Sequence, residues 1–440
     1  MACGRSDALV AITLADHHPS PRGRGSHNMQ NTSPCRSDAP VAKGLADHHP
    51  SPRGRGSHKG SPLVGATPSS RKASQTTTHR PEGGAPANQF FQLLDSRDID
   101  LARGPVFAHG FSWRKRALLR QFTQRHDLVF VRHAAQVPEG ATLLLWGAAV
   151  GPAGLGTGVK VVRLEDGFLR SVGLGADLTR PMSWVIDPLG IYFDARQPSA
   201  LERMLQNAVF SPDLLERAAH FRQLVVAAGL SKYNLAAAPW SRPDTSKPVV
   251  LVPGQVETDA SIATGTLDIK TNMALLQAVR QARPDAWVVY KPHPDVVAGL
   301  RQAGAQEAQA MLWCNEVVLQ ASMSQLLDAL NPQDEVHVMT SLTGFEALLR
   351  GIPVVCYGQP FYAGWGLTLD RYPHPRRTRR LSLDGLVAAA LLLYPVYVSR
   401  VSGQRCSPEQ ALQELLAWRA QSPGGVVWWR RWLRPLLARA

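Results

Sequence analysis

Two adjacent carboxylates, Glu165 and Asp166, follow the apolar run 159–164 and precede Gly167. Such a run is typical of a buried parallel strand, and open α/β sheets bind their ligands beyond the carboxyl ends of these strands. Arg163 and Arg170 flank the two acids, which favours a site for a polar substrate. The same residues also fit a strand-end turn with two solvated acids. The motif alone leaves both interpretations open.

A second group of polar side chains follows the apolar run 249–252. Its members are Gln255, Glu257, Asp259 and Ser261, and Gly254 gives the loop backbone freedom. One acid there suits a nucleophile or a base, because a carboxylate can attack an anomeric carbon or accept a proton. A surface turn is the competing interpretation.

A rigid histidine follows the apolar run 287–290. Pro292 and Pro294 bracket His293, which fixes its backbone and keeps it out of a helix. With Lys291 beside it, His293 is a good partner for the phosphate of a leaving group. The alternative is a loop whose histidine only caps a neighbouring group.

Small hydroxyl residues open a predicted helix after the apolar run 336–339. Ser341 and Thr343 suit N-caps, and the same position binds phosphate through backbone N–H groups and the helix dipole. Glu346, one turn further on, is placed to accept ribose hydroxyls. The chain has no Walker lysine and no Gly-x-Gly-x-x-Gly, which disfavours a P-loop or a dinucleotide fingerprint. The acids show no convincing metal-ligand spacing, so no metal and no cofactor are expected.

The elements that must position these loops alternate between strands and helices. Strands are predicted at 106–108, 128–131, 143–146, 159–164, 249–252, 287–290, 336–339 and 354–356. Helices are predicted at 113–124, 198–208, 212–228, 271–283, 320–330 and 343–350. The stretch 236–248, rich in Ala, Pro, Ser and Asp, is a predicted linker. The fold class is therefore α/β, with two Rossmann-like domains facing a cleft.

This pattern predicts four parts: a leader 1–88, a Rossmann-like domain 89–240, a second one 249–400, and a C-terminal helix and tail 401–440. In the leader, residues 15–27 recur as 46–58. We interpret it as disordered low-complexity sequence without chemistry. A translated upstream repeat, with the true translation start further along, is the alternative interpretation. The segment 426–437 mixes Trp and Arg with Leu and Val. It suits an anchor on anionic lipid or a helix packed back on the domain.

The basic residues lie at the two ends of the chain. Residues 1–80 carry 11 Lys+Arg against 4 Asp+Glu, and residues 372–440 carry 11 against 3, whereas 81–371 carry 26 against 27. This distribution argues against a nucleic-acid-reading face. The five cysteines form no Cys-x-x-Cys pair, which favours free thiols in a reducing compartment. No signal peptide is apparent, and Pro395 breaks the longest apolar run, so we expect a cytoplasmic protein.

Taken together, these motifs resemble the bacterial capsular-polysaccharide β-Kdo glycosyltransferases of the KpsC type. The matching segments are 163–171, 187–194, 230–234, 252–261, 291–295, 341–351 and 362–368. Full members of that family carry two transferase modules in tandem, whereas this chain has the length and motifs of one. The segment 255–261 is more similar to the second module.

The resemblance implies a GT-B-like fold and retaining transfer of Kdo from CMP-Kdo to a Kdo-containing glycolipid primer, in capsular polysaccharide biosynthesis and export. It implies Asp259 as nucleophile and Glu165 or Asp166 as acid/base. Residues 89–240 become the acceptor side and 249–400 the CMP-sugar side. The implied donor-binding residues are His293, Pro294, Lys291, Ser341, Thr343 and Glu346. Further cleft candidates are Arg163, Arg170, Gln255, Glu257 and Ser261.

The implied partners are CMP-Kdo, a glycolipid acceptor, the inner-membrane surface and other capsule assembly or export proteins, with no nucleic acid. The expected location is cytoplasmic and peripheral at the inner membrane, and no metal is implied. One alternative is a transferase of the same fold that uses another nucleotide sugar, such as CMP-sialic acid. Another is a non-catalytic, membrane-associated capsule-assembly module, against which the intact acids argue.

Overall fold

The computed structural model describes residues 101, 104–172, 179–230, 238–299, 301–304 and 306–421, which belong to one compact unit. The leader 1–88, motif residues 231–234 and the tail segment 426–437 lie outside the described residues. Cys314, Cys356 and Cys406 are free thiols. No helix in the described part of the chain is both long and apolar enough to cross a membrane.

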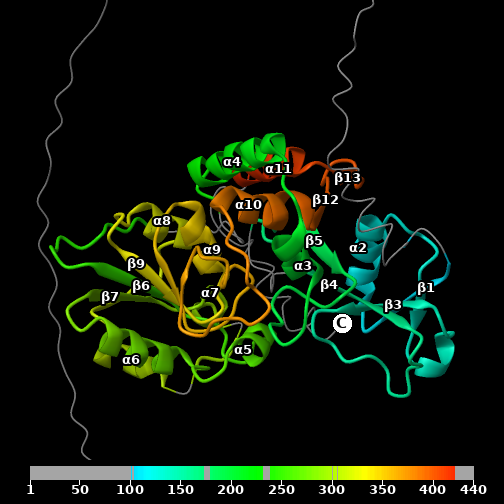
Figure 1. Ribbon diagram of the computed structural model, residues 1–440, viewed down its shortest axis with the longest axis horizontal. Coiled ribbons are helices and arrows are strands. Elements are labelled where there is room, and N and C mark those ends of the chain that lie inside the picture. The colour runs from blue at the N-terminus through cyan, green and yellow to red at the C-terminus, as the bar shows by residue number, and fades with distance from the viewer. Residues whose placement is uncertain are drawn as a thin grey trace, which may run out of the picture. The chain divides into compact units, whose positions relative to one another are not determined.

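The first of two sheets has seven strands, in the order β13-β12-β5-β4-β3-β1-β2 (Figure 1). Strands β1 to β4 pair in parallel, whereas β5, β12 and β13 join by antiparallel pairing. The strands are β1 (Val106–His109), β2 (Val129–Val131), β3 (Thr142–Trp146), β4 (Lys160–Asp166), β5 (Ser183–Asp187), β12 (Pro395–Val398) and β13 (Arg405–Cys406).

The second sheet has six strands, all parallel, in the order β11-β10-β9-β6-β7-β8. Its strands are β6 (Val249–Pro253), β7 (Trp287–Lys291), β8 (Glu316–Val317), β9 (Glu335–Val338), β10 (Val354–Cys356) and β11 (Leu369–Asp370). Numbered along the chain, this is the order 3-2-1-4-5-6 of a Rossmann sheet. The order reverses between β6 and β9, so a ligand crevice is expected beyond the carboxyl ends of those two strands.

Serine residues begin most of the helices. Ser112, Ser199, Ser211, Ser322, Ser341, Ser382 and Ser407 each accept a backbone N–H of the first turn that follows. The helices are α2 (Trp113–Thr123), α3 (Ala200–Asn207), α4 (Pro212–Ala227), α5 (Ala260–Gly265), α6 (Asn272–Ala282), α7 (Pro294–Val297), α8 (Met323–Asp328), α9 (Leu342–Leu349), α10 (Leu383–Val387) and α11 (Pro408–Ala420). Short 3₁₀ turns span Ala134–Gln136 and Glu307–Leu312, and a π-helix, Ala388–Leu393, continues α10.

The predicted α/β alternation and all eight predicted strands are confirmed. Three differences concern the first sheet. Strands β5 and β13 were not predicted, and β12, which the sequence grouped with the second half, pairs with β5 in the first sheet. The physical reason is that residues 383–398 are almost all buried, so no polar residue marks where the helix gives way to the strand. The chain therefore returns to the first sheet after completing the second.

A continuous buried cluster joins the two sheets. It contains Val185 of β5, Leu251 of β6 and the aromatic residues around Phe168. The Phe168 ring lies 4.6 Å from the Phe361 ring centre and 6.0 Å from that of Phe345 in α9. Rings at these separations add to the apolar burial. The segment after β4 is thereby held against the second sheet's helices.

Candidate active site

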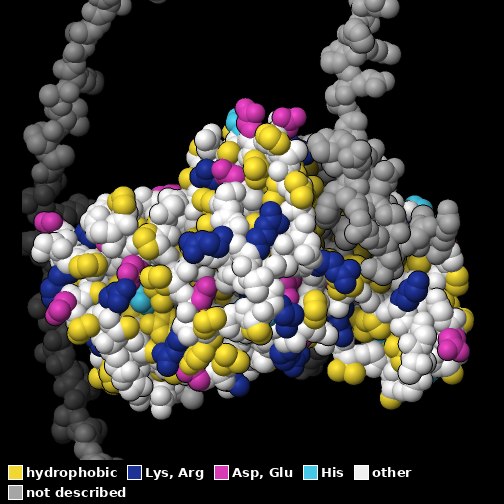
Figure 2. Space-filling model, in the orientation of Figure 1, with side chains coloured by type: hydrophobic (Ala, Val, Ile, Leu, Met, Phe, Trp, Pro, Cys, Tyr) yellow, Lys and Arg dark blue, Asp and Glu magenta, His cyan; other side chains and the backbone are white. Residues whose placement is uncertain are grey.

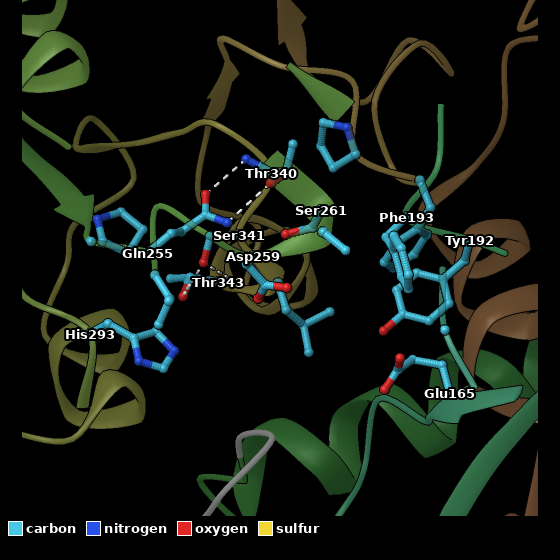
Figure 3. A pocket seen from close by; sticks show the side chains of 18 of the residues that line it. Glu165, Tyr192, Phe193, Gln255, Asp259, Ser261, His293, Thr340, Ser341 and Thr343 are labelled. Carbon is cyan, nitrogen blue, oxygen red and sulfur yellow. Dashed lines mark hydrogen bonds between the residues drawn. The ribbon is translucent and has the colours of Figure 1, made fainter. Parts of the chain in front are cut away.

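A pocket of about 600 Å³ lies where loops of the two sheets meet (Figure 3). Strand ends β3 and β4 of the first sheet and β6, β7 and β9 of the second contribute to its wall. The crevice predicted between β6 and β9 is therefore part of this pocket. Its polar lining residues are Glu165, Tyr192, Gln255, Asp259, Ser261, Lys291, His293, Thr340, Ser341, Thr343 and Glu346.

Gln255 ties the two strand ends at the switch point together. Its side-chain N–H donates to the Thr340 hydroxyl at 3.0 Å, and its Oε1 accepts from the Thr340 backbone N–H at 2.9 Å. The backbone of Gln255 makes a second reciprocal pair with the buried side chain of Asn272, at 2.9 Å in both directions. Such a fully satisfied network rigidifies its surroundings. Gln255 thus fixes the floor of the pocket.

Asp259 stands at the start of α5, in the N-cap position, with extended backbone. Its carboxylate makes no capping hydrogen bond, and no hydrogen bond or ion pair with another described residue holds it. In Figure 3 it points into the centre of the pocket, below Ser261 and beside Thr343. The start of α5 therefore positions Asp259, and the described residues leave its carboxylate oxygens available to a ligand.

His293 and Lys291 line the β7 end of the pocket. The His293 Nδ1 accepts the backbone N–H of Asp295 at 3.1 Å, which leaves the proton of a neutral ring on Nε2. Lys291 donates to the Leu319 carbonyl at 2.8 Å. Burial lowers the pKa of Lys291 to about 8, so the side chain is largely cationic at neutral pH. Pro294 begins α7 directly after the histidine.

The start of α9 supplies hydroxyl groups to the same wall. Ser341 accepts the Thr343 backbone N–H at 3.2 Å and donates to the Thr343 hydroxyl at 3.1 Å. Glu346, one turn into the helix, is buried and lines the pocket. Gly344 of this helix has no room for a side chain, because the Tyr362 hydroxyl packs directly on it. Hydroxyls and a helix start at one place suit an anionic ligand.

Glu165 lies across the pocket from Asp259, on the side of the first sheet (Figure 3). It belongs to strand β4 and pairs with Val185 of β5. The strand therefore continues through both acids, and the turn that the sequence predicted after residue 164 begins only after Asp166. One Glu165 oxygen accepts the Asp166 N–H at 3.0 Å. The other lies 2.8 Å from where a Cβ would stand at Gly147, whose φ is +52°. A glycine is needed there to leave room for the carboxylate.

The neighbouring acid, Asp166, does not line the pocket. Successive strand residues face opposite sides, and Asp166 forms a 2.6 Å ion pair with Arg170, whose other N–H donates to Ser171. Arg163 is also outside the lining and donates to the carbonyls of Gly147 and Ala149, at 2.8 and 3.0 Å. The two arginines flanking the acidic motif therefore support the wall.

Glu257 is the remaining predicted cleft residue that does not line the pocket. Its carboxylate accepts the backbone N–H of Asn272 at 2.8 Å, at the start of α6. An acid at a helix start compensates the helix dipole. Within the segment 255–261, Gln255, Asp259 and Ser261 therefore line the pocket, whereas Glu257 contacts the start of α6.

Several lining residues were not identified from the sequence. The pocket is also lined by Tyr192, Phe193, Thr340 and the loop after Trp146. None of these residues has an acidic, basic or thiol side chain, which are the types that indicate catalysis in a sequence. Lys115 of α2 was also missed, although its Nζ lies 3.3 Å from the centre of the Trp146 ring. Burial lowers the pKa of Lys115, and the charges of Glu165 and Asp166 oppose that effect. Only the fold brings this lysine to the acidic motif.

No group of three or more His, Cys, Asp or Glu side chains within the described ranges could hold a metal ion. The buried acids Asp187 and Asp194 have other partners. Asp187 accepts the Tyr394 hydroxyl at 2.7 Å and backbone N–H groups of residues 189, 190 and 200, whereas Asp194 pairs with Arg196 at 2.8 Å. Both acids therefore act within the structure of the loops after β5.

Comparison with known proteins gives one consistent picture. Residues 153–406 match the family model described as capsule polysaccharide biosynthesis protein. The chain is 41% identical over 345 residues to the capsule polysaccharide modification protein LipA of Neisseria meningitidis serogroup A, covering 75% of this chain and 49% of LipA. The chain thus spans about half the length of that curated relative.

Two solved structures from Thermosulfurimonas dismutans are also similar. One is the KpsC β-Kdo 2,7 transferase, with 41% identity and a TM-score of 0.60, covering 71% of this chain and 99% of the other. The second is the KpsC β-Kdo 2,4 transferase, with 30% identity and a TM-score of 0.62, covering 72% and 99%. Each of these structures is matched over nearly its full length.

Proposed function

Because this chain belongs to the capsule polysaccharide biosynthesis protein family, and to its KpsC type, we propose that it is a glycosyltransferase that moves Kdo from CMP-Kdo to a glycolipid primer. The observation that carries the proposal is the pocket itself. Asp259 and Glu165 come from different sheets and face each other, with Lys291, His293 and the start of α9 beside Asp259. Two acids that flank a sugar site serve both stereochemical outcomes of glycosyl transfer, and we propose retention because Asp259, without a described hydrogen-bond partner, is available as a nucleophile.

In the proposed first step, the Asp259 carboxylate attacks the anomeric carbon of Kdo. The bond between that carbon and the phosphate oxygen breaks, and CMP leaves with the electron pair. The phosphate charge that develops is stabilised by the Lys291 ammonium, the His293 Nε2–H and the hydroxyls of Ser341 and Thr343. Glu346 accepts the ribose hydroxyls, and Pro294 fixes the backbone that follows the histidine.

In the proposed second step, an acceptor hydroxyl on the side of the first sheet attacks the anomeric carbon of Kdo, and the bond between that carbon and the Asp259 oxygen breaks. Glu165 takes the hydroxyl proton, and the Asp259 carboxylate is released. Two inversions at one carbon give net retention. Glu165 is favoured over Asp166 because Asp166 is engaged by Arg170 at 2.6 Å and does not line the pocket. Asp166 and Arg170 would position the strand end that carries Glu165.

The product linkage we favour is β-2,7. The identity to the 2,7 transferase structure is 41%, against 30% for the 2,4 transferase. Each of these single-transferase structures is matched over 99% of its length, which supports a single-linkage enzyme that needs a second transferase for an alternating polymer. The acceptor would be a Kdo-containing glycolipid, so the enzyme would work in the cytoplasm at the inner-membrane surface, beside other capsule assembly and export proteins.

The proposal is tested by incubating the full chain with CMP-Kdo and a Kdo-primed acceptor. Release of CMP and an NMR spectrum of a β-2,7-linked product are expected. Turnover of CMP-sialic acid without turnover of CMP-Kdo would overturn the donor assignment. Binding of the glycolipid with no CMP release from either donor would favour a non-catalytic assembly module.

A further inference from the structure

One surface outside the pocket combines exposed apolar and basic side chains. It consists of Trp113, Arg114, Arg116 and Arg120 of α2, together with Val129 and Phe130 of the adjoining edge strand β2. We call it the α2–β2 face. Trp113 is 62% exposed and Val129 is 45% exposed. The buried side chains of α2 are Leu119, Phe122 and Thr123, so the α2 residues of this face lie outside the core, whereas Phe130 packs partly against it.

The α2–β2 face carries three arginines and no acidic side chain. The one acid of residues 111–133, Asp127, is paired with Arg125. Within the described part of the chain, Arg114, Arg116 and Arg120 make no ion pair with an acidic side chain. Their guanidinium groups lie instead over aromatic rings, with Arg114 5.0 Å from Trp113 and Arg116 and Arg120 4.6 and 5.1 Å from Phe130. Arg116 also donates from its Nε to the Phe111 carbonyl at 3.2 Å, and no described carboxylate neutralises any of the three positive charges.

The same helix also contacts the wall of the pocket. Lys115 lies between the basic residues of the face in sequence but turns inward, over the ring of Trp146, which lines the pocket. A partner bound to the outer side of α2 would therefore lie one helix diameter from the Glu165 side of the site. Under the proposed function that is the acceptor side, where a membrane lipid must present its sugar.

We propose that the α2–β2 face docks on an anionic phospholipid surface. Arginines with an exposed tryptophan beside them are suited to the headgroup region of a bilayer, where charge and aromatic burial act together. A nucleic acid is a poorer fit, because its backbone follows a continuous basic track. Figure 2 shows Lys and Arg side chains in separate groups over the described surface that it draws, and the α2–β2 face itself holds only three arginines.

This inference rests on the proposed function only for the reason why the chain would bind a membrane. The binding itself is measured without donor or acceptor. The full chain is sedimented with vesicles of phosphatidylcholine plus phosphatidylglycerol, or of phosphatidylcholine alone. The test variant is Trp113→Ser/Arg114→Gln/Arg116→Gln. Its matched control is Leu312→Ser/Lys247→Gln/Lys270→Gln, which removes the same charge and an exposed apolar residue elsewhere, with no change to the pocket lining.

The wild-type chain and the control variant should bind the anionic vesicles, and the test variant should bind them at least about tenfold more weakly. Hydrogen–deuterium exchange in peptides from 111–133 should slow when anionic vesicles are added. Unchanged binding by the test variant would overturn the inference, as would equal binding to neutral vesicles. A loss of self-association in the test variant, without a loss of vesicle binding, would assign the face to a second copy of the chain instead.

Transfer to a soluble Kdo acceptor separates this inference from the proposed function. The test variant should retain that activity, because none of its changes lies in the pocket. If the chain binds anionic vesicles through α2 but releases no CMP from CMP-Kdo, the docking proposal stands and the proposed transferase activity is refuted.

Discussion

Four consecutive residues, 165–168, have four different surroundings. Glu165 faces the pocket, Asp166 pairs with Arg170, Gly167 packs directly against Ser183, and Phe168 stacks near Phe361. The sequence indicated that acids stand at the end of a strand, and this is confirmed. It could not choose between the two acids, because the choice depends on the pairing of Glu165 with Val185 and of Asp166 with Trp184.

The two acids should therefore differ when each is replaced by its amide. Glu165→Gln should lower kcat by about a hundredfold to ten-thousandfold, the usual contribution of a general base. Asp166→Asn should lower it less and should lower Tm instead, because a nearly buried ion pair with Arg170 is broken. Steady-state kinetics and thermal unfolding of both variants give the comparison. A larger loss of kcat in Asp166→Asn would reverse the assignment.

Lys291 should make donor binding depend on pH. Burial lowers its pKa to about 8, so its positive charge is present below that pH and is lost as pH rises through it. The KM for CMP-Kdo should rise above pH 8, by up to about tenfold per pH unit. Lys291→Arg should remove this dependence, because arginine remains charged. A wild-type KM that stays constant between pH 7 and pH 10 would exclude Lys291 from phosphate binding.

At the scale of elements, the loop between β3 and β4 sets the space available to Glu165. Gly147 and Gly154 both have positive φ, +52° and +79°, but only at Gly147 would an added Cβ meet a neighbour, the Glu165 carboxylate at 2.8 Å. Either Gly→Ala change should cost about 1 kcal/mol of folding free energy, because the left-handed region disfavours alanine. Only Gly147→Ala should also lower kcat, by about tenfold to a hundredfold.

The Gly154→Ala variant is the control for that backbone strain. Denaturant unfolding should give similar losses of stability for the two variants, whereas turnover should separate them. Equal kcat values would mean that the loop does not position Glu165.

Four of the six strands of the second sheet were predicted from the sequence, and the two-residue edge strands β8 and β11 were missed. Strands such as β6 are uniformly apolar and buried, and each is followed by a polar loop and a helix. The first sheet was harder, because β5 and β12 enter it by antiparallel pairing from distant parts of the chain. Lys115, Tyr192 and Asn272 reach the site only through tertiary packing, and no local pattern marks them.

At the scale of the whole molecule, Glu202 links the helix after β5 to the segment after β11. Its carboxylate accepts from Arg376 at 2.6 Å and from Arg377 at 3.0 Å, and its side chain is only 8% exposed. Burial alone would raise the pKa of Glu202, but the two arginines lower it below its ordinary value. The carboxylate therefore stabilises the fold above the ordinary glutamate range, and this contribution disappears as pH falls through the lowered pKa.

Glu202→Gln should cost about 3 kcal/mol at pH 7, and the difference from the wild type should shrink on acidification. The control is Glu409→Gln, whose partner Arg217 is one-third exposed and whose loss should cost about 0.5 kcal/mol. Thermal unfolding across the acidic range measures both. Equal effects of the two changes would mean that the Glu202 cluster is not a main connection between the sheets.

We propose above that Asp259 and Glu165 divide the two steps of a retaining transfer between them. This proposal is tested most directly by mixing the Glu165→Gln variant with CMP-Kdo and analysing the protein by mass spectrometry with peptide mapping. We expect a covalent adduct of one Kdo residue on the peptide that contains Asp259, because the first step proceeds and the second is stalled. An adduct on another residue, or CMP release and normal product formation by Asp259→Asn, would contradict it.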